Sequence, residues 1–197
     1  MKNGARGALV FAALLACTGS ARAALHTEAV EYRQGGALLE GYLAYDDALQ
    51  GKRPGVEVLK RHPRGDPSRM AAMGYCFGGM AALELARSGE DLRGVVSFHG
   101  VLSTPHPEDA KKIKGRVLVL HGADDPNVSP QEVAIFEEEM RAAGVKYRLV
   151  QYPGAVHSFT VPEAGNDPSL GIAYDAAADA RSWEELKRFL AQIFGSE

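Results

Sequence analysis

Apolar and polar positions in the carboxyl-terminal part of this chain predict strands and helices in alternation. Short apolar runs, typical of buried strands, cover residues 70–76, 94–98, 116–120 and 147–152. Stretches with helical spacing of apolar residues extend to residue 88 and cover residues 131–143 and 175–194. Strands that alternate with helices form parallel sheets with helices on both faces. The pattern therefore predicts a three-layer α/β fold, with the loops after the strands gathered at one sheet edge.

The amino-terminal part has a different pattern. Residues 27–32 and 37–44 read as two strands around the turn signal Gln34-Gly35-Gly36, which predicts a β-hairpin. Residues 52–65 are basic, contain proline and show little periodicity. If part of the usual chain has been deleted or spliced, we expect the deletion within residues 52–65.

Residues 1–23 are typical of an export signal. Lys2 and Arg6 precede an apolar stretch over residues 7–16, and the sequence Ala21-Arg22-Ala23 resembles a cleavage site. Cleavage after Ala23 would leave residues 24–197 as one α/β domain in the periplasm of a bacterium. The alternative is a lipoprotein, processed and acylated at Cys17. The apolar stretch is too short to span a bilayer, so we expect no membrane partner unless Cys17 is lipidated.

Charge narrows the choice of partners. The whole chain has a formal net charge of −3, and loss of Lys2, Arg6 and Arg22 would change it to −6. A mildly acidic surface makes nucleic acid and anionic membranes unsuitable partners. Cleavage would also remove Cys17 and leave Cys76 as a lone thiol in an oxidising compartment, where it needs a chemical reason or must be buried and inert.

Cys76 stands between two glycines, Gly74 and Gly78, where an apolar run meets a predicted helix. Small residues at these positions allow the tight strand-to-helix turn that raises a nucleophile above the sheet. Asp124 and Asp125 follow the predicted strand at residues 116–120, and His157 follows the predicted strand at residues 147–152. The order nucleophile, acid, histidine is the order of α/β-hydrolases. We expect the amino end of the helix to favour the Cys76 thiolate, His157 to accept the thiol proton, and an aspartate to orient His157.

These stretches resemble the dienelactone hydrolase family, a branch of the α/β-hydrolases with a cysteine nucleophile. The resemblance rests on GYCFGG, VSFHG, HGADDP and YPGAVHSFT, which begin at residues 74, 96, 121 and 152, and it extends to residues 41–46 and 51–56. It implies Cys76, His157 and Asp125, rather than Asp124, as the catalytic triad. It also implies hydrolysis of small ester or lactone substrates through an acyl-cysteine, without a cofactor. The amide of Phe77 directly follows the nucleophile and would donate to the oxyanion.

The resemblance also implies that a segment is missing. Family members continue from the strand at residues 53–56 into a histidine–glutamate loop, a helix, a strand and a further helix, whereas Val56 here runs directly into residues 57–63. The absent part normally supplies the second oxyanion donor and the neighbour of the nucleophile strand. The exposed strand edge would then be covered by the hairpin or by a second copy, unless the gene is damaged. A non-catalytic remnant or binding protein is therefore the alternative to a hydrolase.

Three further features change the interpretation little. His99 and His121 could join Cys76 and His157 around a metal, but their spacing matches no zinc motif, so we expect none. Family members that act on dienelactone have an arginine after the histidine, and residues 158–162 contain none. The acidic run at residues 137–139 is typical of a solvated helix face.

Overall fold

A computed structural model describes residues 25–34, 37–46, 56, 60, 61, 63 and 66–195. The chain forms two compact units, Met1–Leu59 and Lys60–Glu197. The predicted export signal, the alternative lipidation site at Cys17 and the junction between Val56 and Glu57 lie outside the described residues. No helix within the described ranges is long and apolar enough to cross a membrane.

The first unit contains the predicted hairpin. β1 (Leu25–Gln34) pairs antiparallel with β2 (Ala37–Asp46), in a register that places Gln34 opposite Ala37. The prediction of a hairpin is confirmed, and each strand is longer than the apolar pattern indicated.

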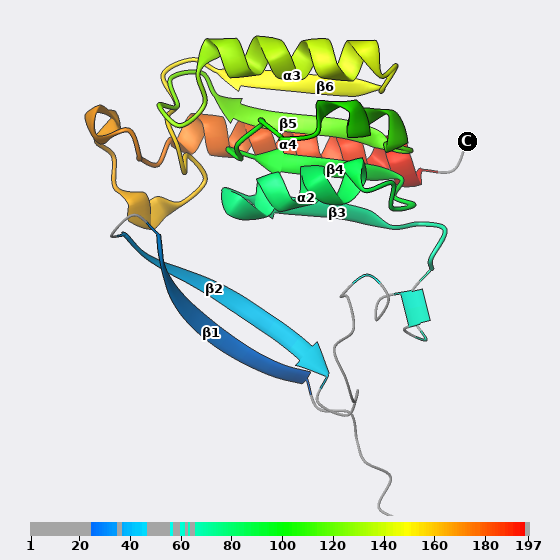
Figure 1. Cartoon of the computed structure of the whole chain (residues 1–197). Helices are drawn as coiled ribbons and strands as arrows, with labels where there is room; N and C mark the ends of the chain where they lie inside the picture. Colours follow the sequence, from blue (N-terminus) through cyan, green and yellow to red (C-terminus); the bar gives the residue numbers. More distant parts are fainter. Residues whose placement is uncertain are drawn as a thin grey trace, which may run out of the picture. The chain divides into compact units, whose positions relative to one another are not determined.

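The second unit contains a four-stranded parallel sheet in the order β3-β4-β5-β6 (Figure 1). The strands are β3 (Ala71–Tyr75), β4 (Gly94–Phe98), β5 (Arg116–Gly122) and β6 (Tyr147–Tyr152). Three α-helices with described bounds accompany these strands: α2 (Phe77–Arg87), α3 (Pro130–Ala142) and α4 (Ala176–Phe194). The predicted parallel α/β sheet is thereby confirmed.

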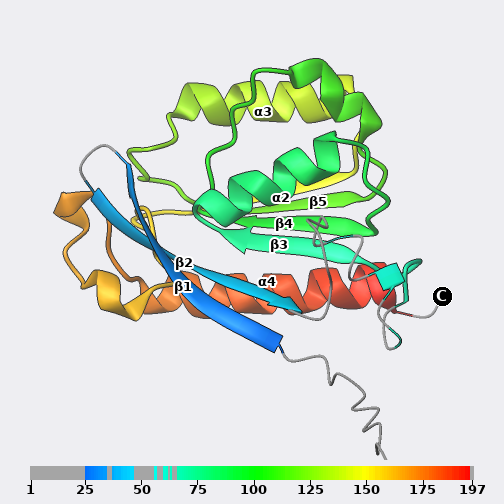
Figure 2. The ribbon, with the colours of Figure 1, turned by 60° about the horizontal axis from the view of Figure 1, so that its bottom comes forward.

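The sheet is covered on both faces. α2 and α3 lie on one face and α4 on the other (Figure 2). Side chains of β5 alternate between the two cores: Val117 and Val119 pack with α2 and α3, whereas Leu118 and Leu120 pack with α4. This alternation within one continuously apolar strand explains why a run without polar residues forms a buried parallel strand.

β3 is an edge strand in the described part of the chain. It pairs with β4 only, in the register Ala71 opposite Gly94. This agrees with the expectation that the strand leading to Cys76 lacks a neighbour. Met73 and Tyr75 on this strand are 45% and 41% exposed.

The sequence did not predict the three short 3-10 helices, η1 (Pro107–Lys112), η2 (Pro162–Ala164) and η3 (Pro168–Leu170). Each begins at a proline within a loop, where apolar periodicity carries no signal.

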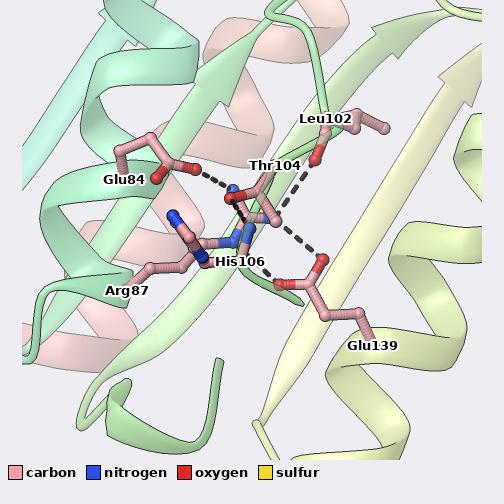
Figure 3. Close-up of polar contacts among 6 residues, drawn as sticks. All are labelled: Glu84, Arg87, Leu102, Thr104, His106 and Glu139. Carbon is pink, nitrogen blue, oxygen red and sulfur yellow. Dashed lines mark hydrogen bonds and ion pairs between the residues drawn. The ribbon is translucent and has the colours of Figure 1, made fainter. Parts of the chain in front are cut away.

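The expected solvated face at residues 137–139 is wrong for Glu139, which is buried. Its carboxylate accepts from Arg87 Nε at 2.8 Å and Arg87 Nη2 at 2.9 Å (Figure 3). Arg87 also donates to Glu84 at 2.7 Å and to the Leu102 carbonyl at 3.1 Å. Helical spacing places Glu139 on the inner face of α3 beside Met140. The guanidinium of Arg87, on α2, compensates the buried charge of its carboxylate.

Candidate active site

Cys76 occupies a strained turn between β3 and α2. Its backbone has φ 54° and ψ −120°, a conformation that residues other than glycine rarely adopt. Its amide donates to the Phe98 carbonyl at 2.9 Å, and its carbonyl accepts from the amides of Gly79 at 3.0 Å and Met80 at 3.2 Å. These bonds hold the exposed thiol at the end of the sheet.

The turn explains one of the two flanking glycines. A Cβ on Gly74 would collide with the carbonyl of Gly78, whereas a Cβ on Gly78 would meet nothing within 4 Å. The expectation that both positions need small side chains is therefore correct for Gly74 only. Gly78 matters because its backbone approaches Gly74.

The loop after β5 positions Asp125. Its amide donates to the Gly122 carbonyl at 3.1 Å, and its Oδ1 accepts from the Asn127 amide at 2.9 Å. The neighbouring Asp124 is exposed and accepts from the Gly154 amide at 3.0 Å. Asp124 thus helps to tie the aspartate loop to the histidine loop, while Asp125 points to a different partner.

The loop after β6 positions His157. Its amide donates to the Gly171 carbonyl at 3.2 Å, and its carbonyl accepts from the Ala173 amide at 3.1 Å. These bonds form an isolated parallel bridge between His157 and Ile172. The histidine is therefore fixed by the segment that leads into α4.

The three predicted residues meet at one imidazole ring. His157 Nε2 lies 3.1 Å from Cys76 Sγ, and His157 Nδ1 lies 2.9 Å from Asp125 Oδ2. The Asp125 side chain is fully buried and that of His157 is 10% exposed. This arrangement can hold a proton between sulfur and imidazole while the carboxylate orients the ring.

The local charges favour a thiolate–imidazolium pair. Hydrogen bonding to His157 lowers the pKa of the Cys76 thiol, and a hydrogen bond from the Phe77 amide acts in the same direction. Burial acts to lower the pKa of His157, but the hydrogen bonds to Asp125 and Cys76 outweigh it and raise that pKa to about 9. Burial likewise opposes ionisation of Asp125, yet hydrogen bonds from His157 and the Asn127 amide leave the pKa of this carboxyl lowered.

Phe77 begins α2 directly after the thiol. Its amide is one of the first in the helix, which have no carbonyl partner within the helix. This amide acts to lower the pKa of the Cys76 thiol, and its role as an oxyanion donor stays a prediction.

The sequence did not predict that His99 and Thr160 lie together beside the triad. His99 follows β4 and is 1% exposed, with φ 38°, and its Nε2 lies 3.0 Å from Thr160 Oγ1. Its place at a strand end, followed by glycine, made His99 a candidate metal ligand, although strand-end histidines often belong to hydrogen-bond networks instead. Within the described ranges, no three His, Cys, Asp or Glu side chains are grouped to hold a metal ion. His121 is also buried, and its Nδ1, like that of His99, has no hydrogen-bond partner.

A family model for the dienelactone hydrolase family matches residues 24–194, which includes every residue of this site. The chain belongs to the dienelactone hydrolase family. An uncharacterized protein of Caenorhabditis elegans is 36% identical over 141 residues, which are 71% of this chain and 89% of the relative.

Other family members are longer. A protein assigned as a carboxymethylenebutenolidase from Saccharolobus solfataricus is 35% identical over 130 residues, covering 64% of this chain but 45% of the relative. A second, from Salmonella typhimurium, is 29% identical over 68% of this chain and 50% of the relative. The chain thus spans about half the length of these carboxymethylenebutenolidase relatives.

A solved structure has a similar fold across its whole length. It is the crystal structure of a dienelactone hydrolase-like promiscuous phosphotriesterase from metagenomic libraries, with a TM-score of 0.66 and 28% identity, covering 87% of this chain and 100% of that chain. A dienelactone hydrolase homologue from Klebsiella pneumoniae, 24% identical with a TM-score of 0.61, shares the fold over 70% of this chain and 57% of its own. The family and these neighbours point to a hydrolase.

Proposed function

We propose that this protein hydrolyses carboxylic ester or lactone bonds of small molecules, with Cys76 as nucleophile, His157 as general base and acid, and Asp125 as the group that orients His157. The observation that carries the proposal is the single imidazole shared by a thiol at 3.1 Å and a buried carboxylate at 2.9 Å. Membership of a hydrolase family supports the same reaction class.

The first half of the reaction would form an acyl-enzyme. The Cys76 thiolate attacks the carbonyl carbon, the S–C bond forms, and the carbonyl electrons move to oxygen. The Phe77 amide stabilises this oxyanion. When the intermediate collapses, the C–O bond breaks and His157 gives its proton to the departing alkoxide.

The second half would release the acid. His157, now neutral, accepts a proton from water, and the resulting hydroxide attacks the acyl-cysteine carbonyl. Collapse of this second intermediate restores the thiolate and the imidazolium. Asp125 keeps the ring in the orientation that each transfer needs.

The alternative is a non-catalytic remnant or binding protein. In α/β-hydrolases a loop before the nucleophile strand supplies a second oxyanion amide, and the sequence after Val56 lacks the family's pattern there. Loss of one oxyanion donor typically lowers kcat about 100- to 1,000-fold. We therefore expect slow turnover rather than the full rate of a complete hydrolase.

The test is hydrolysis of p-nitrophenyl acetate by the purified chain. We expect wild type to release nitrophenol and a brief incubation to leave an acetyl group on Cys76, visible by mass spectrometry. Cys76→Ala and His157→Ala should both lose turnover, whereas Asp124→Asn, in the same loop as Asp125, should keep it. Folded wild type that is as inert as Cys76→Ala would favour the binding-protein alternative.

We also propose that the chain is exported to the periplasm. The support is the signal-like sequence over residues 1–23. Expression in a bacterium should give a protein with the mass of a chain that begins at Ala24. The mass of a chain that begins at an acylated Cys17 would instead show the lipoprotein.

A further inference from the structure

His99 has an unusual backbone for its residue type. It directly follows β4, and its φ of 38° lies in the left-handed region. Its amide donates to the Leu120 carbonyl at 2.8 Å, and its side chain is buried. Such strain persists where surrounding contacts fix the residue, and it often marks a functional position.

The fixed ring contacts the histidine loop at three places. Nε2 lies 3.0 Å from the Thr160 hydroxyl, three residues after His157. The ring meets that of Phe159 edge-on at 5.3 Å between centroids, and meets the His157 ring at 5.1 Å with an interplanar angle of 70°. The polar bond and both ring contacts therefore join the end of β4 to the loop that carries His157.

The charge state of His99 allows its ring to lie beside a protonated His157. Burial lowers the pKa of His99 to about 4, so the ring is neutral when His157 is an imidazolium. A second cation beside His157 would repel its proton, whereas a neutral ring can pack against it. His121 is also buried, and burial also lowers its pKa. No side-chain hydrogen bond among the described residues joins His121 to the histidine loop, whereas His99 bonds to Thr160 of that loop.

We propose that His99 is a positioning residue, which acts through Thr160 and the ring contact to hold His157 at the sulfur of Cys76. The inference rests on the proposed function, because it concerns the same thiolate. It predicts that loss of the Thr160 hydroxyl loosens His157 and lowers the thiolate fraction of Cys76 without touching either residue directly.

The test is the rate of alkylation of Cys76 by iodoacetamide as a function of pH, which requires a thiolate but no ester hydrolysis. Cys76→Ala measures the background from Cys17. Thr160→Val removes the hydroxyl at nearly constant shape, and we expect alkylation at pH 7 to slow by about three- to tenfold, the usual worth of one hydrogen bond. The midpoint of the pH profile should move upward, and in ester hydrolysis kcat should fall with little change in KM.

Two further variants serve as controls, and a third repeats the test from the side of His99. Thr160→Ser keeps the hydroxyl and should keep the wild-type profile. Thr104→Val removes the hydroxyl of another half-buried threonine, which accepts from the His106 amide at 3.3 Å and is drawn with Arg87 and Glu139 in Figure 3, and it should have no effect. His99→Asn tests the bond from the other side with a residue that tolerates a positive φ, and should resemble Thr160→Val.

The outcomes separate the two proposals. A wild-type midpoint at the ordinary value of a thiol would overturn the activated Cys76 and the proposed function. A low wild-type midpoint that Thr160→Val and His99→Asn leave unchanged would overturn the positioning role alone.

Discussion

Backbone strain at single residues is concentrated around the candidate site. Among the described residues, only Cys76, His99 and Ser158 combine a side chain with a positive φ, at 54°, 38° and 58°. Each such residue costs on the order of 1–3 kcal/mol and must be fixed by its surroundings. The first bears the thiol, the second touches His157 and the third follows it. The strain therefore marks the loops that carry Cys76 and His157, together with the loop that begins at His99.

The sequence predicted part of this arrangement. Cys76, Asp125 and His157 could be found because their order and positions after strands follow from topology, and the structure brings them together. Asp124 could be set aside only by the family resemblance, and the structure gives it a bond to Gly154 instead. His99 and Thr160 could not be paired, since the bond depends on how two loops meet and neither residue has a distinctive spacing.

The pH dependence of hydrolysis follows from the two shifted pKa values. The rate should rise as the thiolate forms, with a midpoint below the ordinary thiol pKa, because that of Cys76 is lowered. It should fall near pH 9, because His157 then loses the proton that the leaving group needs. The two limbs belong to the coupled pair rather than to either residue alone.

The measurement is the initial rate of hydrolysis of an alkyl ester, whose leaving group needs a proton, as a function of pH. The Cys76→Ala rate is subtracted to remove hydroxide-driven hydrolysis. Asp125→Asn removes the main partner that raises the pKa of His157, so its falling limb should move to lower pH. A wild-type rate that continues to increase well above pH 9 would contradict the proposed role of the imidazolium.

At the scale of elements, local rules determine the boundaries and tertiary contacts change them. The expected and observed limits of β4 and β6 are the same. α3 begins at Pro130 because Ser129 caps it, with the Glu132 amide donating to the Ser129 hydroxyl at 3.2 Å. β5 continues to Gly122 because His121 and Gly122 pair with β6. That extension could not be seen in the apolar run, which ends at Leu120.

The ion pair between Arg87 and Glu139 joins the end of α2 to α3. Both side chains are almost fully buried, so removal of one partner leaves an uncompensated charge. Arg87→Met should lower the free energy of unfolding by about 3–5 kcal/mol. The double variant Arg87→Met/Glu139→Leu should recover much of that loss, because it removes both charges.

Urea unfolding followed by circular dichroism measures these changes. The matched control is Arg141→Met, which removes an exposed pair to Glu138 on the same helix and should cost less than about 1 kcal/mol. Equal losses for Arg87→Met and Arg141→Met would show that the buried pair adds no more than a surface one.

At the scale of the whole molecule, the fold class and family were predictable, whereas the coverage of the sheet edge was not. A parallel α/β sheet follows from alternation alone, and the family follows from the motifs at the strand ends. The chain spans about half of its carboxymethylenebutenolidase relatives, so the usual neighbours of β3 cannot be assumed from them. Sequence periodicity describes single elements, but it does not say which surface covers an unpaired strand.

We propose that two copies of the chain associate through the edge of β3 that is unpaired in the described part of the chain. Parallel strands are normally paired and covered, and an exposed edge with apolar residues is a template for another strand. In the described part, β3 pairs with β4 alone and exposes Met73 and Tyr75. Light scattering over a range of concentrations should therefore show a dimer that dissociates on dilution.

A charge on the edge strand supplies the decisive comparison. Met73→Lys should weaken association by at least tenfold, because a lysine on an edge strand opposes pairing with another chain. Ile135→Lys places the same charge at a position on α3 that is 63% exposed and away from β3, and it should leave association unchanged. A wild-type chain that stays monomeric at every concentration, as both variants do, would contradict the dimer.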